Sequence, residues 1–282
     1  MTDPRRFTLQ LADGEMAGLD FGDLARPVDA VFLHATGFNA STYRQSLGLA
    51  GQRLRVIALD QRGHGLSSLP ADSDGLRDWR PFAEDLSQAL DALKLDRPVV
   101  LSGHSMGGTV SVLAAAHLGA RVRGLVLVDP VIMRAPAGQG VSDSPLVIGA
   151  RRRRPAFASK ADAVRAYLGR GAFRTWPPEA VADYVEDGFR DAADGVALTC
   201  APAWEAGIFS VSVGYDPRLA LDAIAAPIAI LRAEHGSTCD IDPEIHVARF
   251  PDRSLVTVPG SSHFLPMERP DLVAQALLAA CA

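Results

Sequence analysis

The sequence predicts an α/β fold in which helices cover both faces of a mostly parallel, doubly wound sheet. Short apolar runs typical of buried strands alternate along the chain with segments of helical periodicity. This alternation stops over residues 131–216 and then resumes. Because 282 residues can bury one large core, we expect a single sheet domain with a helical cap inserted into it.

The predicted strands follow an irregular N-terminal part. Residues 7–28 are expected to form irregular strands, with turns at Asp13–Gly14 and at 21–23. Short apolar runs then predict buried strands at 30–33, 54–59, 99–102, 122–128, 228–231 and 254–258. The core domain is therefore expected to consist of residues 1–130 and 217–282.

Helices are predicted between these strands and near the end of the chain. Over about residues 79–94, one face contains Phe82, Leu86, Leu90 and Leu93. The last helix is expected to begin at Pro270, and its apolar positions are Leu272, Val273, Ala276, Leu277 and Ala280. Both patterns are typical of helices that pack one face against a sheet.

The inserted cap, residues 131–216, is expected to begin with a loop at 136–140, where proline and glycine cluster. Residues 159–168 are predicted to be a helix that a capping box opens. Pro177 precedes a second helix, whose apolar side contains Val181, Tyr184, Val185 and Phe189. A third helical segment is expected near 203–209.

The composition excludes several classes of protein. Hydrophobic residues make up 48% and charged residues 22% of the chain, as in an ordinary globular protein. The formal net charge of -5 does not indicate a nucleic-acid partner. We interpret the basic run Arg151–Arg154 as a solvated or ion-paired face, because no aromatic stacking surface accompanies it. No apolar stretch is long enough to predict a membrane span.

The cysteines and the N-terminus bear on the compartment. The three cysteines, Cys200, Cys239 and Cys281, lie far apart, which favours a reducing environment and is not the spacing of a metal site. No apolar run follows Met1–Arg6, so we do not expect a secretory signal. These features predict a cytoplasmic protein without structural zinc.

The functional interpretation depends on residues 99–108. An apolar run ends in Gly103-His104-Ser105-Met106-Gly107, and an alanine-rich helical segment follows. Ser105 is therefore expected in a tight, strained turn between a strand and a helix, with its side chain directed outward. Gly103 and Gly107 lack a β-carbon, so the strand and the helix can approach closely. The N–H groups that begin the helix can stabilise negative charge near the serine oxygen.

In this setting the motif resembles the nucleophile elbow of the α/β-hydrolase superfamily. The resemblance covers about residues 30–130 and 225–282. It depends on four motifs in the family's order, which begin at His34, Asp60, Gly103 and Pro259. It implies the α/β-hydrolase fold with Ser105 as the nucleophile. A serine hydroxyl then needs a base, and the base needs an acidic partner that fixes its tautomer.

The resemblance implies that the base is His263. In this superfamily the acid and then the histidine follow the serine along the chain. The chain has seven histidines, of which His34 and His64 precede Ser105. His263 lies in the loop 259–268, between the last predicted strand and the last predicted helix, where the superfamily places its base.

The position of the acid departs from the usual pattern. The superfamily usually places it after the strand at 228–231, but no aspartate lies near Gly236. Some members place the acid after the preceding strand, where this chain has Asp129. We therefore favour Asp129, while Asp240 and Glu234 stay open as alternatives.

An oxyanion hole needs two N–H groups directed at the developing charge. The resemblance implies that Met106 gives one and that the loop after the first core strand gives the other. The family typically has His-Gly-x in that loop, and the match implies the N–H of Thr36. Because Ala35 replaces the glycine, Gly37 stays open as the donor. His34 and the loop 60–67 are expected to support these loops without a chemical role.

The implied reaction is the hydrolysis of a small-molecule ester through an acyl-enzyme, without a metal or an organic cofactor. The serine argues against the epoxide-hydrolase and dehalogenase branches, which have an aspartate at that position. The cap is expected to form an apolar pocket, although several of its large residues fit a cap core equally well. These residues are Phe173, Trp176, Tyr184, Phe189, Trp204, Ile208 and Phe209.

Three alternative functions stay open. They are a carbon–carbon bond hydrolase that acts on vinylogous diketones, a cofactor-free perhydrolase, and a binding protein that keeps the fold without chemistry. The sequence indicates neither the substrate nor the acyl length. It also leaves the oligomeric state open, with a homo-oligomer among the alternatives.

Overall fold

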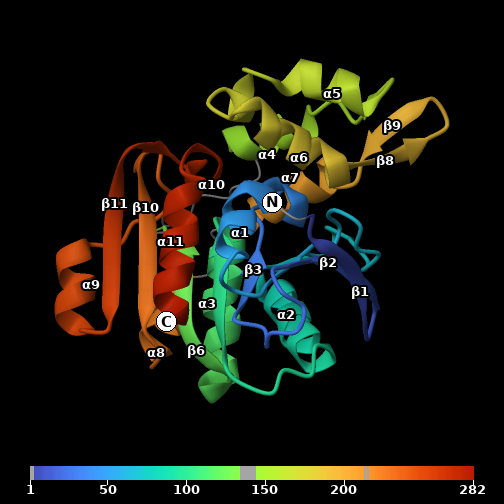
Figure 1. Ribbon diagram of the computed structural model, residues 1–282. Coiled ribbons are helices and arrows are strands. Elements are labelled where there is room, and N and C mark those ends of the chain that lie inside the picture. The colour runs from blue at the N-terminus through green and yellow to red at the C-terminus, as the bar shows by residue number, and fades with distance from the viewer. Residues whose placement is uncertain (1–2, 134–143, 213, 215) are drawn as a thin grey trace.

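The computed structural model describes residues 3–133, 144–212, 214 and 216–282. Among these residues, eight strands form one sheet in the order β1-β2-β4-β3-β5-β6-β10-β11. The parallel strands are β3 (Ala30–Leu33), β4 (Val56–Leu59), β5 (Val99–His104), β6 (Val122–Val128), β10 (Ile228–His235) and β11 (Arg253–Ser262). The predicted α/β class with a mostly parallel sheet is therefore confirmed (Figure 1).

The N-terminal part is more regular than the sequence predicted. β1 (Arg5–Leu11) and β2 (Gly14–Phe21) form an antiparallel hairpin in continuous register, and β2 pairs antiparallel with β4. The prediction of irregular strands was wrong because Phe7, Leu9 and Leu11 alternate with polar residues, which is the pattern of a half-buried edge strand.

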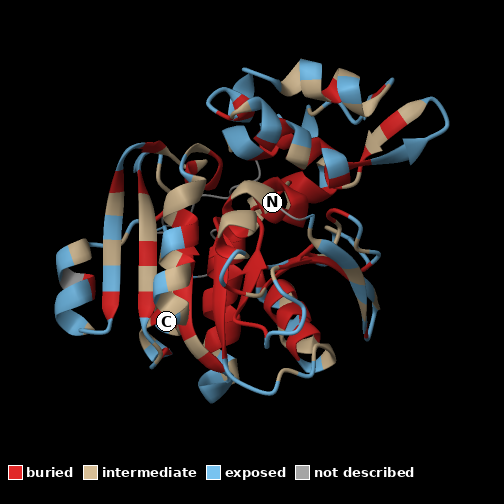
Figure 2. Cartoon of the chain, in the orientation of Figure 1, coloured by how far each residue is buried: buried red, intermediate tan, exposed pale blue. Residues whose placement is uncertain are grey.

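Helices cover both faces of the sheet. The helices on one face are α1 (Arg44–Ala50) and α11 (Pro270–Cys281), and those on the other are α2 (Arg80–Ala92), α3 (Met106–Leu118) and α8 (Arg218–Ala223). Further short helices are α9 (Pro243–Arg249), α10 (Leu265–Glu268) and the 3-10 helices η1 (Ala40–Tyr43), η2 (Gly119–Arg121) and η3 (Gly171–Phe173). Figure 2 shows that burial is most complete in α3 and the central strands.

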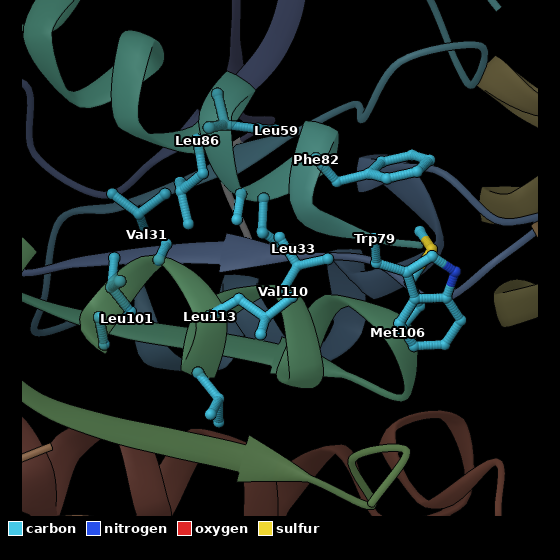
Figure 3. Packing of buried hydrophobic residues seen from close by; sticks show 14 of the residues in the cluster. Val31, Leu33, Leu59, Trp79, Phe82, Leu86, Leu101, Met106, Val110 and Leu113 are labelled. Atoms are coloured by element: carbon cyan, nitrogen blue, oxygen red, sulfur yellow. The ribbon is translucent and has the colours of Figure 1, made fainter. Parts of the chain in front are cut away.

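Alternating side chains of each central strand enter two different cores. On β3, Val31 and Leu33 pack with α2 and α3, whereas Ala30 and Phe32 pack with α1 and α11. Figure 3 shows the first core, in which side chains of α2 and α3 meet those of β3 and β5. Because both faces are buried, these strands have continuous apolar sequences, as the prediction assumed.

The inserted segment forms a separate layer at one end of the sheet (Figure 1). Its helices are α4 (Pro145–Arg151), α5 (Lys160–Tyr167), α6 (Pro178–Gly188) and α7 (Pro202–Ser210), so the three predicted helices are present. Its strands, which the sequence did not predict, are β7 (Ala156–Phe157), β8 (Phe189–Ala192) and β9 (Gly195–Leu198). Phe189 therefore begins a strand and does not extend α6. The loop predicted at 136–140 lies outside the described residues.

Candidate active site

Ser105 occupies the turn between β5 and α3 in the strained conformation that the motif predicts. Its φ of 54° and ψ of -119° are unusual for a residue with a β-carbon. A β-carbon on Gly103 would lie 2.3 Å from the carbonyl carbon of Gly107, and one on Gly107 would lie 2.2 Å from the carbonyl oxygen of Leu33. The two glycines are therefore required by the close packing of β5, α3 and β3.

The structure brings Ser105, His263 and Asp129 together. His263 Nε2 lies 3.1 Å from Ser105 Oγ, and His263 Nδ1 lies 2.6 Å from Asp129 Oδ2. His263 follows β11 in a turn before α10, and Asp129 follows β6. Ser105 is 7% exposed and Asp129 is fully buried, whereas 22% of the His263 side chain is exposed. The burial of Asp129 strengthens its electrostatic interaction with the imidazole.

The Asp129 carboxylate is held mainly from the end of β10. Its Oδ1 accepts hydrogen bonds from the Ala233 N–H at 2.8 Å and the Ser237 hydroxyl at 2.6 Å. Its Oδ2 accepts a hydrogen bond from the Thr238 N–H at 3.1 Å. Burial opposes ionisation of Asp129, but the hydrogen bonds from His263, Ser237 and Ala233 outweigh it and lower its pKa. The carboxylate is therefore ionised beside the imidazole at neutral pH.

The two alternative acids do not meet His263. Glu234 Oε2 accepts a hydrogen bond from the Gly260 N–H at 2.8 Å. Asp240 is exposed, and its own N–H donates to the carbonyl of Ile132. Among the three acids considered from the sequence, the geometry therefore favours Asp129.

The loop after β3 lies against the elbow, as an oxyanion hole requires. The Thr36 hydroxyl lies 3.3 Å from Met106 Sδ, which brings the two expected donor residues into contact. The Gly37 N–H is donated to His64 Nε2 at 3.0 Å. Gly37 has a φ of 76°, so the chain turns sharply there. The alternative donor is thus engaged elsewhere, which favours Thr36.

Two buried histidines support this loop, in agreement with the structural role predicted for His34. His34 Nδ1 donates to the carbonyl of Ala35 at 2.8 Å, and its Nε2 accepts from the Gln61 N–H at 2.9 Å. His64 Nδ1 donates to the carbonyl of Arg62 at 3.0 Å. Burial lowers the pKa of both histidines, that of His64 to about 4, so both imidazoles are neutral.

One arginine of the basic run has a role that the sequence did not predict. Arg151, Arg152 and Arg154 are exposed, as interpreted, but only 17% of the Arg153 side chain is exposed. Arg153 Nη1 donates to Glu205 Oε2 at 2.5 Å. A β-carbon on Gly37 would lie 2.5 Å from Glu205 Oε1 and 3.3 Å from Arg153 Nη1. This ion pair therefore joins α7 to the segment that follows α4, next to the oxyanion loop.

Glu268 on α10 fixes the loop that contains His263. Its carboxylate accepts from the Ser262 N–H at 2.7 Å and from the Ser262 hydroxyl at 2.6 Å. It also accepts from the Thr175 hydroxyl of the inserted segment at 2.6 Å. The sequence did not predict this role.

Aromatic rings line the region between the inserted segment and His263. The ring centroid of Phe264 lies 5.7 Å from that of His263, 6.2 Å from that of Phe38 and 5.8 Å from that of Trp176. Trp176 is one of the predicted cap residues. In contrast, Trp204 faces α2 and donates its indole N–H to the carbonyl of Arg62 at 3.1 Å. Of these two predicted cap residues, one therefore lies near His263 and the other packs against the core domain.

Neither a cluster of potential metal ligands nor a membrane-spanning helix is present in the described ranges. No cluster of three or more histidine, cysteine, aspartate or glutamate side chains is arranged there to hold a metal ion. Within the same ranges, every helix is too short or too polar to cross a bilayer. Cys200, Cys239 and Cys281 are free thiols.

Comparison with known proteins identifies the family of this chain. A sequence profile of the alpha/beta hydrolase family matches residues 30–276. The 2-(acetamidomethylene)succinate hydrolase of Mesorhizobium japonicum is 25% identical over 248 residues, which are 88% of this chain and 85% of that protein. Human monoglyceride lipase is 34% identical over 107 residues, 36% of this chain and 35% of the lipase. The crystal structure of E-2-(acetamidomethylene)succinate hydrolase has a TM-score of 0.82 at 22% identity, with 98% of both chains covered. The chain belongs to the alpha/beta hydrolase family.

Proposed function

We propose that the protein is a serine hydrolase that cleaves carboxylic esters of small apolar substrates. The main support is the continuous line of contacts from Ser105 Oγ through His263 to Asp129. A serine in a strained turn, a base within hydrogen-bond distance and a buried acid behind the base form the arrangement that activates a hydroxyl nucleophile. The family match supports a hydrolase, and the geometry supports serine chemistry within it.

In the proposed reaction, Ser105 Oγ attacks the ester carbonyl while His263 Nε2 accepts the serine proton. The N–H groups of Met106 and Thr36 stabilise the negative oxygen of the tetrahedral intermediate. The intermediate collapses to the acyl-enzyme, and His263 gives its proton to the departing alcohol. Water then attacks the acyl-enzyme with His263 as base, which releases the acid and regenerates Ser105. Asp129 holds the imidazole and stabilises its protonated form.

The surroundings of the site support an apolar substrate. Phe38, Trp176 and Phe264 form an aromatic group next to His263, with no charged side chain among them. Among the relatives, monoglyceride lipase is an ester hydrolase by name. We therefore expect esters with an uncharged, apolar acyl group to react best.

The test is the hydrolysis of p-nitrophenyl esters with acyl chains from acetate to laurate, with Ser105→Ala alongside. We expect turnover in the parent and a loss of about 10⁴-fold or more in kcat for the variant. The acyl length that gives the highest kcat/KM indicates how long an acyl chain the pocket accommodates. Turnover that persists in Ser105→Ala would exclude the mechanism. A parent that does not hydrolyse the esters but cleaves vinylogous diketones would favour the carbon–carbon bond hydrolase. Peroxide-dependent halogenation by the parent would favour the perhydrolase.

A further inference from the structure

A chain of buried hydrogen bonds connects the oxyanion loop with the loop of the base. The Ala35 N–H donates to Tyr43 Oη at 3.0 Å, and Tyr43 Oη lies 2.8 Å from His104 Nδ1. His104 Nε2 lies 2.7 Å from the carbonyl oxygen of His263. Tyr43 is 1% exposed and His104 is fully buried. Neither side chain contacts Ser105 Oγ, so the ester reaction as described above does not use them.

The direction of each hydrogen bond in this chain follows from the groups at its two ends. A carbonyl oxygen can only accept, so the proton of His104 is on Nε2. His104 Nδ1 is then an acceptor, and the Tyr43 hydroxyl donates to it. That leaves Tyr43 Oη to accept from the Ala35 N–H. Burial lowers the pKa of His104 to about 3, in agreement with this neutral tautomer.

The chain joins the three parts of the site that must be aligned for the reaction. Ala35 precedes Thr36, whose N–H is a proposed oxyanion donor. His104 precedes the nucleophile Ser105, and its partner is the backbone of His263 itself. Rings on either side restrict both side chains: Tyr43 packs on Phe32 with centroids 4.7 Å apart, and Phe38 stacks on His104 at 6.4 Å.

We propose that Tyr43 and His104 are positioning residues, which set the distance between the oxyanion donors and the base through this chain. The proposal rests on the serine hydrolase function proposed above. Catalytic groups must be held within about 0.5 Å of their productive geometry, and a displacement of 1 Å can reduce the rate about 100-fold. Three consecutive hydrogen bonds between the backbone N–H of Ala35 and the backbone carbonyl of His263 supply such a restraint.

The test uses a p-nitrophenyl alkylphosphonate, which transfers its phosphonyl group to a reactive serine and releases one p-nitrophenolate per active site. Saturation kinetics separate the maximal rate of phosphonylation from the apparent affinity for the probe. We expect Tyr43→Phe to lower the maximal rate about tenfold and His104→Leu to lower it about 100-fold. The apparent affinity should change less than about threefold, because neither residue touches the probe.

Two variants of His104 and Tyr43 distinguish positioning from simple packing. In His104→Gln the amide N–H₂ can replace Nε2 as the donor to the His263 carbonyl, so we expect a rate within about tenfold of the parent. In the double variant Tyr43→Phe/His104→Leu, the loss should be close to that of His104→Leu alone, because both substitutions interrupt the same chain of hydrogen bonds. Additive losses would contradict the chain.

Ser102→Ala is the matched control. Ser102 is fully buried on β5, the strand that also contains His104. Its hydroxyl donates to the Val126 carbonyl at 2.7 Å and does not reach the site. The Ser102→Ala variant should lower the urea midpoint of unfolding as much as Tyr43→Phe does, but its phosphonylation rate should equal that of the parent. Rates of Tyr43→Phe and His104→Leu equal to that of the parent would overturn the positioning role alone. A parent that does not react with the phosphonate would overturn the proposed function and this inference together.

Discussion

Asp129 reaches His263 across the end of a strand that lies between them. Asp129 follows β6 and His263 follows β11, yet Asp129 Oδ2 and His263 Nδ1 are 2.6 Å apart. β10 lies between the two strands. Ala233 of β10, and Ser237 in the loop after it, donate hydrogen bonds to the carboxylate. Because neighbouring parallel strands end at the same edge, an acid on β6 can take the position that β10 leaves empty near Gly236.

The first prediction concerns this acid. Asp129→Asn should lower kcat for a p-nitrophenyl ester about 10⁴-fold, because an amide in this position favours the wrong tautomer of His263. Asp240→Asn and Glu234→Gln are the matched controls, since neither side chain meets the imidazole, and both should keep near-parental kcat. An Asp129→Asn loss no larger than that of the controls would exclude this acid.

The second prediction concerns the elbow. Gly107→Ala would place a β-carbon 2.2 Å from the Leu33 carbonyl oxygen, where only backbone could move. We expect the free energy of unfolding to fall by about 3 kcal/mol or more, measured by urea denaturation. Gly149→Ala on α4 is the control, because its β-carbon would meet nothing within 4 Å. That change should be neutral or stabilise the protein by up to about 1 kcal/mol.

The third prediction concerns the buried ion pair above Gly37. Arg153→Met leaves the Glu205 carboxylate without its cation and should cost about 3–5 kcal/mol of unfolding free energy. The double variant Arg153→Met/Glu205→Met should recover most of that loss, because no buried charge remains. A double-mutant cycle in urea measures the difference. A loss of unfolding free energy in the double variant equal to the sum of the losses in Arg153→Met and Glu205→Met would show that the two charges do not interact.

The fourth prediction concerns pH. Burial lowers the pKa of His34, His64 and His104, those of His64 and His104 to about 4 and about 3. As the pH falls below about 6.5, these histidines take up protons in the unfolded chain before they do so in the folded chain. The stability that the neutral, buried imidazoles contribute at higher pH is therefore lost progressively toward pH 4. Each histidine contributes up to about 1.4 kcal/mol per pH unit.

Asp60 acts with the opposite sign over part of this range. Burial raises its pKa to about 7, so the folded state keeps a proton that the unfolded state loses above about pH 4. The three fully buried histidines outweigh Asp60 between pH 7 and pH 5, so these four groups together should lower the free energy of unfolding over that interval. In His64→Gln the amide oxygen can still accept from the Gly37 N–H. The slope of the free energy of unfolding against pH should decrease in this variant by the amount that corresponds to one proton. A parent that is equally stable at pH 7 and pH 5 would contradict this assignment.

The fold could be predicted, and Ser105 and His263 could be singled out as candidates, because local sequence patterns point to them. The strained turn at Ser105 needs Gly103 and Gly107, and a loop histidine after the last strand is recognisable at His263. The acid stayed open because its identity depends on which strand ends meet in space. Sequence order alone cannot show that the end of β6 lies within reach of the loop after β11.

Features that arise from packing between distant segments could not be predicted. Four consecutive arginines have the same local pattern, and only the position of α7 decides that Arg153 is buried against Glu205. The strand β7 is two residues long, too short for periodicity to indicate it. The hydrogen bonds of Tyr43 likewise depend on how η1 lies beside the elbow.

The carboxylate of Glu268 bonds two parts of the molecule that are far apart in the sequence. Its bonds to Ser262 hold the loop of His263, and its bond to Thr175 holds the inserted segment. A single side chain therefore couples the inserted segment to the loop of the proposed base. A substitution at Thr175 should alter the restraint on that loop, although Thr175 lies 93 residues before Glu268 in the sequence.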